Sequence, residues 1–159
     1  MLFRSAAGKV VPIDFLGAAY GGDRLVLVGN EGYAGMTQNG VDWWWSRALP
    51  SGITNDLVSL AYRSGQFVAA STTNLVVTSR DGTNWVFRRI EVPLKRIRVS
   101  PSGFIGLLTD ERIGLSPDGE TWSFVQEHGQ GVSTCIAGFG TEIVLTGERS
   151  EEHTSELQS

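Results

Sequence analysis

The chain has 159 residues, of which 41% are apolar and 19% are charged, and its formal net charge is −4. This length and composition fit one globular domain and argue against a chain that is disordered throughout. The acidic balance argues against a nucleic-acid partner, which selects for a basic surface, and the single cysteine excludes an internal disulfide bond. No apolar run is long enough to span a membrane.

The first repeat unit is expected at residues 14–50. Short apolar runs alternate there with glycine-rich turns, which favours strands over helices. Its last turn reads MTQNGVDW and leads into Trp43, Trp44 and Trp45. Because side chains alternate along a strand, Trp43 and Trp45 are expected to share one face and Trp44 the other. Packing between sheets is the favoured role, and the alternative is an exposed Trp44 that stacks on a sugar or a protein partner.

The second unit, at residues 55–90, has the clearest pattern. Four strands are expected, at Leu57–Tyr62, Gln66–Ala70, Leu75–Ser79 and Trp85–Ile90. The turn between the last two strands reads TSRDGTNW, and Asp-Gly is a strong hairpin signal. No stretch of ten residues in the unit shows helical spacing. The unit is therefore predicted to be four antiparallel strands.

The third unit, at residues 94–128, repeats the turn as LSPDGETW. Its first strand reads LKRIRVS and is charged where the first strands of the other units are apolar. Five basic residues gather in this strand and just before it: Arg88, Arg89, Lys95, Arg96 and Arg98. A solvated outer strand and link is the favoured explanation, and an anion or acidic-glycan contact is the functional alternative.

The units are related by a common spacing. The turn tryptophans (Trp43, Trp85, Trp122) and the first residues of the preceding apolar strands (Leu25, Phe67, Phe104) both recur after 42 and then 37 residues. A fourth copy begins within residues 131–148. Tyr20 and Tyr62 occupy equivalent positions, and equivalent positions usually serve packing, so both are expected in the core.

Periods near 40 residues with four short strands each are typical of propeller blades. The predicted fold class is therefore all-β, a β-propeller fragment of about three and a half four-stranded antiparallel blades within residues 1–148. Propeller rings close with about 4–8 blades, so this number of blades predicts unpaired strand edges.

The last eleven residues, Arg149–Ser159, read RSEEHTSELQS and resemble the translation of a widely used sequencing adapter. We exclude this segment from the fold as a non-native tail, and we assign no function to its acidic residues and histidine. The natural gene is expected to continue beyond Glu148, which makes the chain a truncated propeller.

The recurring turn resembles the Asp-box of BNR-type propellers, a sialidase-like superfamily that also contains many non-enzymes. The residues that carry the resemblance are Ser79, Asp81, Gly82 and Trp85; Ser116, Asp118, Gly119 and Trp122; and, in a looser form, Thr37, Asn39, Gly40 and Trp43. An aspartate or asparagine can accept backbone N–H groups within its own turn, and glycine can adopt a positive φ. The turn is therefore expected to be structural. Calcium binding is the alternative, but one carboxylate in a turn is too few for a dedicated site, so neither a metal nor a cofactor is expected.

The resemblance also raises the question of catalysis. Sialidases need an arginine cluster, a tyrosine–glutamate pair and an aspartate acid, and their Phe-Arg-Ile-Pro motif has no good match in this chain. His128 lies in the glycine-rich stretch QEHGQG and is expected to be an exposed loop histidine. Cys135 lies in an apolar strand and is expected to be a buried small residue, not a nucleophile. No catalytic residue is therefore assigned.

The leading functional prediction is a non-catalytic module that binds a glycan or protein ligand, associated with a surface outside the cell or on a virion. One alternative is a sialidase-like glycoside hydrolase whose catalytic residues lie in blades outside this chain. Another is an assembly or scaffold factor that holds a protein partner. Fold does not decide among them, because propellers support many functions.

Overall fold

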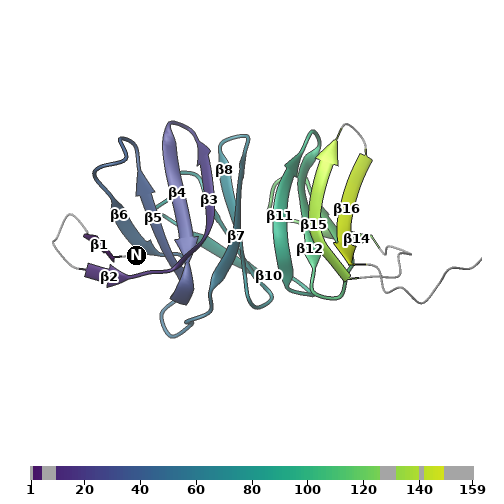
Figure 1. The fold of residues 1–159 in the computed structure, drawn as a ribbon, viewed down its shortest axis with the longest axis horizontal. Coiled ribbons are helices and arrows are strands. Elements are labelled where there is room, and N and C mark those ends of the chain that lie inside the picture. The colour runs from purple at the N-terminus through teal and green to yellow at the C-terminus, as the bar shows by residue number, and fades with distance from the viewer. Residues whose placement is uncertain (1, 5–9, 126–131, 140–141, 149–159) are drawn as a thin grey trace, which may run out of the picture.

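The computed structural model describes residues 2–4, 10–125, 132–139 and 142–148. Within these ranges the chain is almost entirely β-structure, and Figure 1 shows its sheets standing in a row along the long axis of the molecule. The helical turn that they contain, Asn30–Gly32, is three residues long, and no helix in the described part of the chain could cross a membrane.

Three sheets each contain four antiparallel strands that follow one another in sequence. Blade 1 consists of β3 (Phe15–Gly21), β4 (Arg24–Gly29), β5 (Tyr33–Thr37) and β6 (Trp44–Arg47). Blade 2 consists of β7 (Leu57–Arg63), β8 (Gln66–Ser71), β9 (Leu75–Ser79) and β10 (Val86–Arg89). Blade 3 consists of β11 (Leu94–Ser100), β12 (Gly103–Leu108), β13 (Ile113–Ser116) and β14 (Ser123–Val125). The predicted four-stranded antiparallel units are confirmed.

Two further sheets contain two antiparallel strands each. One pairs β1 (Leu2–Arg4) with β2 (Val10–Pro12), which leads into blade 1. The other pairs β15 (Val132–Phe139) with β16 (Glu142–Glu148), and we call this pair the half blade. Ile136 of β15 joins Ile105, Leu107 and Ile113 in one apolar cluster, so the half blade packs on blade 3.

A β-bulge recurs at the same place in the first strand of every unit. The bulges begin at Phe15, Leu57, Leu94 and Ser133, which lie 42, 37 and 39 residues apart. The first two spacings equal those of the turn tryptophans. Because a bulge is a property of the backbone ladder and not of the turn, it is an independent sign of the repeat.

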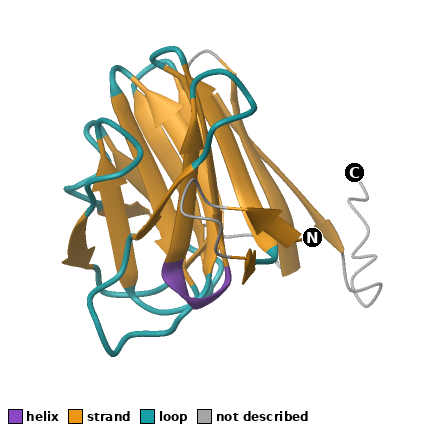
Figure 2. Ribbon diagram, turned by 90° about the vertical axis from the view of Figure 1, so that its left-hand side faces the viewer, coloured by secondary structure: helices purple, strands orange, loops and turns teal. Residues whose placement is uncertain are grey.

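The apolar core lies between the sheets. Residues of blades 1 and 2 form one buried cluster around Val26, Phe67 and Val77, and residues of blades 2 and 3 form a second around Val68 and Ile97. All five residues of β9 are buried, whereas all four of β10 are exposed. Neighbouring blades therefore cover the inner strands of blade 2 on both faces and leave its outermost strand to solvent. Figure 2 looks along the row, so that the sheets lie one behind another.

The first strands of neighbouring blades also meet through polar contacts. The backbone N–H of Ile97 donates to the hydroxyl of buried Ser59 at 3.0 Å, and that hydroxyl lies 3.4 Å from the Ile97 carbonyl. The Arg63 guanidinium donates to the carbonyls of Ser100 and Pro101. Hydrogen bonds thus join β7 to blade 3 beside the apolar core.

The prediction that Tyr20 and Tyr62 both lie in the core is confirmed for Tyr62 and wrong for Tyr20. Tyr62 packs against Phe67, with 4.6 Å between ring centroids, but Tyr20 is 70% exposed. A Cβ at Gly21 would lie 1.9 Å from the Tyr62 ring, so Gly21 faces blade 2 and its neighbour Tyr20 points the other way. Tyr20 therefore lies on the face of blade 1 that is turned away from blade 2.

The tryptophans of blade 1 follow the predicted alternation. The rings of Trp43 and Trp45 are stacked with centroids 5.6 Å apart, and Phe15 stacks on Trp45 at 5.8 Å. Trp44 is 48% exposed. The first and third tryptophans therefore share an aromatic cluster, and the second faces away from it.

Candidate functional site

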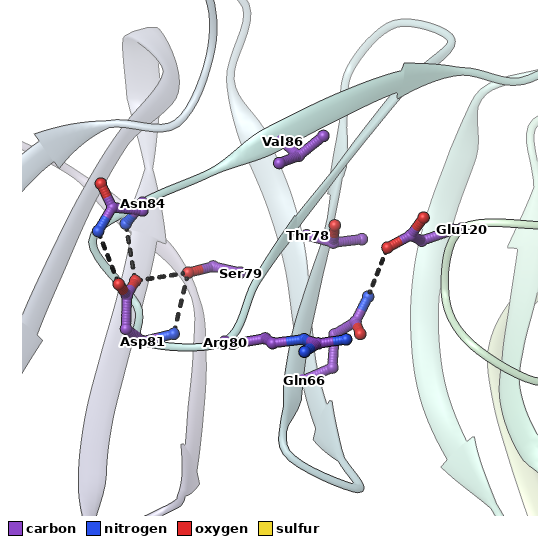
Figure 3. A pocket seen from close by; sticks show the side chains of 8 residues that line it. All are labelled: Gln66, Thr78, Ser79, Arg80, Asp81, Asn84, Val86 and Glu120. Atoms are coloured by element: carbon purple, nitrogen blue, oxygen red, sulfur yellow. Dashed lines mark hydrogen bonds between the residues drawn. The ribbon is translucent and has the colours of Figure 1, made fainter.

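The turn between β9 and β10 is held by its own side chains. The Ser79 hydroxyl accepts the backbone N–H of Gly82 at 2.9 Å, and one Asp81 carboxylate oxygen accepts the N–H groups of Thr83 and Asn84 at 2.8 and 2.7 Å. The other carboxylate oxygen accepts the Asn84 side-chain amide at 2.7 Å. Figure 3 shows this closed network of serine, aspartate and asparagine.

The turn between β13 and β14 repeats the same bonds. The Ser116 hydroxyl accepts the N–H of Gly119 at 2.7 Å, and the Asp118 carboxylate accepts the N–H groups of Glu120 and Thr121, each at 2.8 Å. Two turns 37 residues apart in sequence therefore have one hydrogen-bonding pattern.

The turn between β5 and β6 achieves this pattern with different side chains. The Thr37 hydroxyl accepts the N–H of Gly40 at 2.9 Å, and the Asn39 amide oxygen accepts the N–H groups of Val41 and Asp42 at 2.9 Å. An uncharged oxygen is thus sufficient for the bonds.

In the described part of the chain, no cluster of three or more histidine, cysteine, aspartate or glutamate side chains could hold a metal ion.

Each of the later two turns also contacts the preceding blade. Trp85 packs on the core between blades 1 and 2, and Trp122 packs on the core between blades 2 and 3. A Cβ at Gly82 would lie 2.6 Å from Val26 of blade 1, and one at Gly119 would lie 2.3 Å from Val68 of blade 2. The glycines are therefore needed both for the turn and for close contact between blades.

The hydrogen bonds of the turns lower the pKa of both aspartates. For Asp81, partial burial raises the pKa, but the bonds donated by Asn84, Thr83 and Ser79 outweigh it and bring the pKa well below its usual range. For Asp118, the backbone N–H of Thr121 is the leading cause of the lowered pKa. Both side chains are therefore carboxylates at neutral pH.

Replacing Asp81 by alanine is expected to lower the free energy of unfolding at pH 7 by about 1–2 kcal/mol, because several donors lose a partly solvated acceptor. Asp81→Asn should cost less than about 1 kcal/mol, since Asn39 makes the equivalent bonds in the first turn. Urea unfolding of both variants measures these losses in the free energy of unfolding. Equal losses for alanine and asparagine would contradict the role of the accepted N–H bonds.

The same variants give a pH test. Because the Asp81 pKa is lower in the folded chain than in the unfolded one, its stabilising contribution is complete above the unfolded pKa of about 3.9. It is lost as the pH falls from there through the folded pKa. The stability of Asp81→Asn should therefore fall less steeply below pH about 4 than that of the parent chain.

A shallow depression of about 220 Å³ lies beside the second turn, where blade 2 meets blade 3. The residues that line it are mostly polar in type, but the surface they present to it is mainly apolar; they are Gln66, Thr78, Ser79, Arg80, Asp81, Asn84, Val86 and Glu120. Figure 3 shows Arg80 extending from the turn towards Gln66, whose amide lies 3.4 Å from the Glu120 carboxylate of blade 3. The Arg80 guanidinium has no hydrogen bond or ion pair with any described residue.

Sequence reasoning did not single out Gln66, Arg80 or Glu120. Arg80 and Glu120 occupy positions that differ from one turn to the next. The sequence feature that could have identified them as site residues is a charge at a position that a hairpin leaves exposed. The Glu120 carboxylate also accepts a hydrogen bond from Arg88 Nε at 3.0 Å. Blades 2 and 3 are therefore joined by an ion pair beside the depression.

The topology separates the five basic residues that are neighbours in sequence. Arg88 and Arg89 lie on β10, the outermost strand of blade 2, whereas Lys95, Arg96 and Arg98 lie on β11, the first strand of blade 3. Lys95 forms an ion pair with Glu111, and one Arg98 N–H donates to the Ile97 carbonyl at 2.9 Å. Arg96 is exposed and forms neither an ion pair nor a hydrogen bond with any described residue.

The predictions for His128, Cys135 and the tail concern residues whose side chains the structure does not describe. His128 and the tail Arg149–Ser159 lie outside the described residues. For Cys135 the structure describes only the backbone, in β15.

No protein-family model matches the chain, and neither does any curated protein. Among solved structures, the chain is similar to YCF48 bound to D1 peptide, with a TM-score of 0.66 and 13% identity over 84% of this chain and 45% of that one. YCF48 from Cyanidioschyzon merolae gives a TM-score of 0.56 and 14% identity over 72% of this chain and 38% of that one. The chain thus spans less than half the length of these two structures. Likeness at this identity concerns the fold alone, and it establishes the four-stranded sheets as blades of a β-propeller.

Proposed function

We propose that the chain forms a non-catalytic β-propeller module that binds an extended segment of a protein partner. The observation that carries the proposal is the depression between blades 2 and 3, which combines an unpaired guanidinium with a carboxylate and an amide. Backbone and side-chain groups of a peptide offer partners for all three.

The size and chemistry of the depression favour binding over catalysis. Its volume of about 220 Å³ is smaller than the roughly 300–1,000 Å³ typical of pockets that enclose a small ligand. Asp81 has a lowered pKa and is occupied by N–H donors of its own turn, so it is a poor proton donor at neutral pH. Glu120 is paired with Arg88.

The depression suits one or two side chains of an extended peptide. Arg80 offers donors for a carboxylate of the partner, and Val86, which is 56% exposed, offers an apolar contact beside it. The structure of YCF48 with a bound peptide is of a protein with a similar fold, and it supports a polypeptide as the class of ligand.

We also propose that the three turns are Asp-boxes and that the chain belongs with the sialidase-like propellers. The shared hydrogen bonds of the turns, with Ser or Thr and Asp or Asn as acceptors, support this. An anion or acidic-glycan contact is a second candidate role, and the exposed Arg96 supports it on β11 rather than across all five basic residues.

The test is to select peptides for binding to the full chain from a random library displayed on phage, and to measure their affinities by fluorescence anisotropy. Arg80→Ala should weaken binding by about fivefold or more, because it removes the charged donor. Glu120→Gln should also weaken binding if the partner carries a basic group. Gln38→Ala is the matched control, since Gln38 holds the equivalent position in the first turn, and it should have no effect.

Two results would count against the proposal. Selected peptides that bind Arg80→Ala and Glu120→Gln as tightly as the parent chain would place the contact elsewhere. Hydrolysis of a fluorogenic sialoside by the purified chain would overturn the non-catalytic assignment in favour of the glycoside hydrolase alternative.

A further inference from the structure

Two large aromatic side chains are half exposed at the junction between blades 1 and 2. Trp44 on β6 is 48% exposed, and Phe87 on β10 is 49% exposed. Both blades have all four strands among the described residues, so this exposure arises between two complete sheets. Aromatic residues are enriched in surfaces that bind other polypeptides, so this junction is a candidate contact surface.

The register of the sheets shows that both side chains face the same junction. Trp44 lies opposite Met36, and Phe87 lies opposite Val77. Residues directly opposite each other in a ladder point to the same face of the sheet. Met36 and Val77 both pack in the apolar core between blades 1 and 2. Trp44 therefore faces blade 2, Phe87 faces blade 1, and the two border the outer end of that core from opposite sides.

The depression beside Arg80 lies on the other side of β10. Val86, which lines the depression, directly precedes Phe87, and successive side chains of a strand point to opposite faces. β10 thus presents Phe87 to the junction of blades 1 and 2, and Val86 to the junction of blades 2 and 3. Figure 3 shows Val86 and Arg80 at the same depression. A segment that crosses β10 at this level would contact both junctions.

The charges at this surface favour an acidic partner. Glu120 is paired with Arg88, and the Asp81 carboxylate accepts N–H groups of its own turn. Arg24 of blade 1 lies against the same turn, with its Nη1 3.4 Å from the Arg80 carbonyl oxygen. Neither Arg24 nor Arg80 has a carboxylate partner among the described residues. Two cations that are free to bind a carboxylate therefore flank the turn between β9 and β10.

We propose, on the basis of the peptide-binding function proposed above, that the extended peptide lies across β10. A large apolar side chain of the peptide lies between Trp44 and Phe87, and an acidic side chain binds Arg80. Packed sheets are about 10 Å apart, and an extended chain advances about 3.3 Å per residue. The apolar and acidic residues of the partner should therefore be about two to four positions apart. The apolar surface around the two cations suits such side chains better than the hydroxyl groups of a glycan.

The test uses the full chain and the peptides selected from the random library. We expect most selected sequences to carry an aromatic or large aliphatic residue about two to four positions from an aspartate or glutamate.

The aromatic contact is tested by measuring the affinity of a selected peptide by fluorescence anisotropy. Trp44→Ala should weaken binding about tenfold or more and Phe87→Ala about fivefold, because buried aromatic residues dominate many interfaces. Trp44→Phe should retain most of the affinity. Leu16→Ala is the matched control, since Leu16 is also 48% exposed but lies on β3, the first strand of blade 1, and it should have no effect.

A charge exchange tests the contact at Arg80. Lysine in place of the acidic residue of the selected peptide should weaken binding to the parent chain about tenfold or more. Arg80→Glu should bind the lysine peptide more tightly than the parent chain does, because the attractive pair is restored with its charges reversed. Equal binding of the lysine peptide by the two chains would place the acidic residue away from Arg80.

The outcomes separate this proposal from the function on which it rests. If Arg80→Ala weakens binding but Trp44→Ala and Phe87→Ala do not, the peptide does not cross β10, and the peptide-binding function still stands. If no peptide is selected, or if none of the three variants weakens binding, both proposals fail. Displacement of the peptide by micromolar sialyllactose would make an acidic glycan the occupant and would overturn both.

Discussion

Replacing Phe67 by alanine is expected to lower the free energy of unfolding by about 3–5 kcal/mol, as large aromatic-to-alanine changes in cores do. Phe67 is fully buried on β8, between blades 1 and 2, and its ring packs 4.6 Å from that of Tyr62. Truncation removes the apolar contact of one blade with the next and leaves a cavity that β-ladders on both sides keep open. Urea unfolding followed by tryptophan fluorescence measures the loss.

The same substitution at Phe87 is the matched control. Phe87 lies on the outermost strand of blade 2 and is 49% exposed, so Phe87→Ala should cost less than about 1 kcal/mol. A loss of about 3–5 kcal/mol could leave Phe67→Ala unfolded, so Phe67→Leu provides a smaller change. The cost of Phe67→Leu should lie between the costs of Phe87→Ala and Phe67→Ala. Equal costs at the two positions would mean that the inner strands do not form the core between the blades.

The repeat could be predicted because it is local in sequence. Turns such as TSRDGTNW depend on neighbours within three residues, so the bonds from Ser79 and Asp81 follow from the residue types. The prediction failed at Tyr20, where the relevant fact is which face of a sheet is covered. Tyr62, the equivalent residue, has blade 1 beside it, and the spacing that relates the two residues carries no information about that neighbour.

The depression beside Arg80 could not be predicted from the sequence for a related reason. Gln66 and Glu120 are 54 residues apart and come from different blades, and only the stacking of the blades brings their side chains together. The reverse holds for Arg89 and Lys95, which are close in sequence but lie on the outermost strand of one blade and the first strand of the next. Hairpin geometry can be inferred from one blade, whereas surfaces require the packing of two.

Gly119→Ala is expected to lower the free energy of unfolding by about 2–4 kcal/mol. Gly119 has φ +76°, which strains any residue with a Cβ, and the added Cβ would lie 2.3 Å from the Val68 side chain on blade 2. The turn of blade 3 could relieve this contact only by moving away from the preceding blade. Trp122, from the same turn, packs on the core between these blades, so the strain would extend to it.

Gly40→Ala separates the backbone strain at positive φ from the contact with the neighbouring blade. Gly40 has the same φ, +76°, but nothing lies within 4 Å of an added Cβ, so this variant retains only the backbone strain of about 1–2 kcal/mol. The difference between the variants therefore measures the contact with the neighbouring blade. Combining Gly119→Ala with Val68→Ala should recover about 1–2 kcal/mol relative to the sum of the single changes, because the shortened side chain makes room for the new Cβ. Strict additivity in that double-mutant cycle would show that the turn of blade 3 does not touch blade 2.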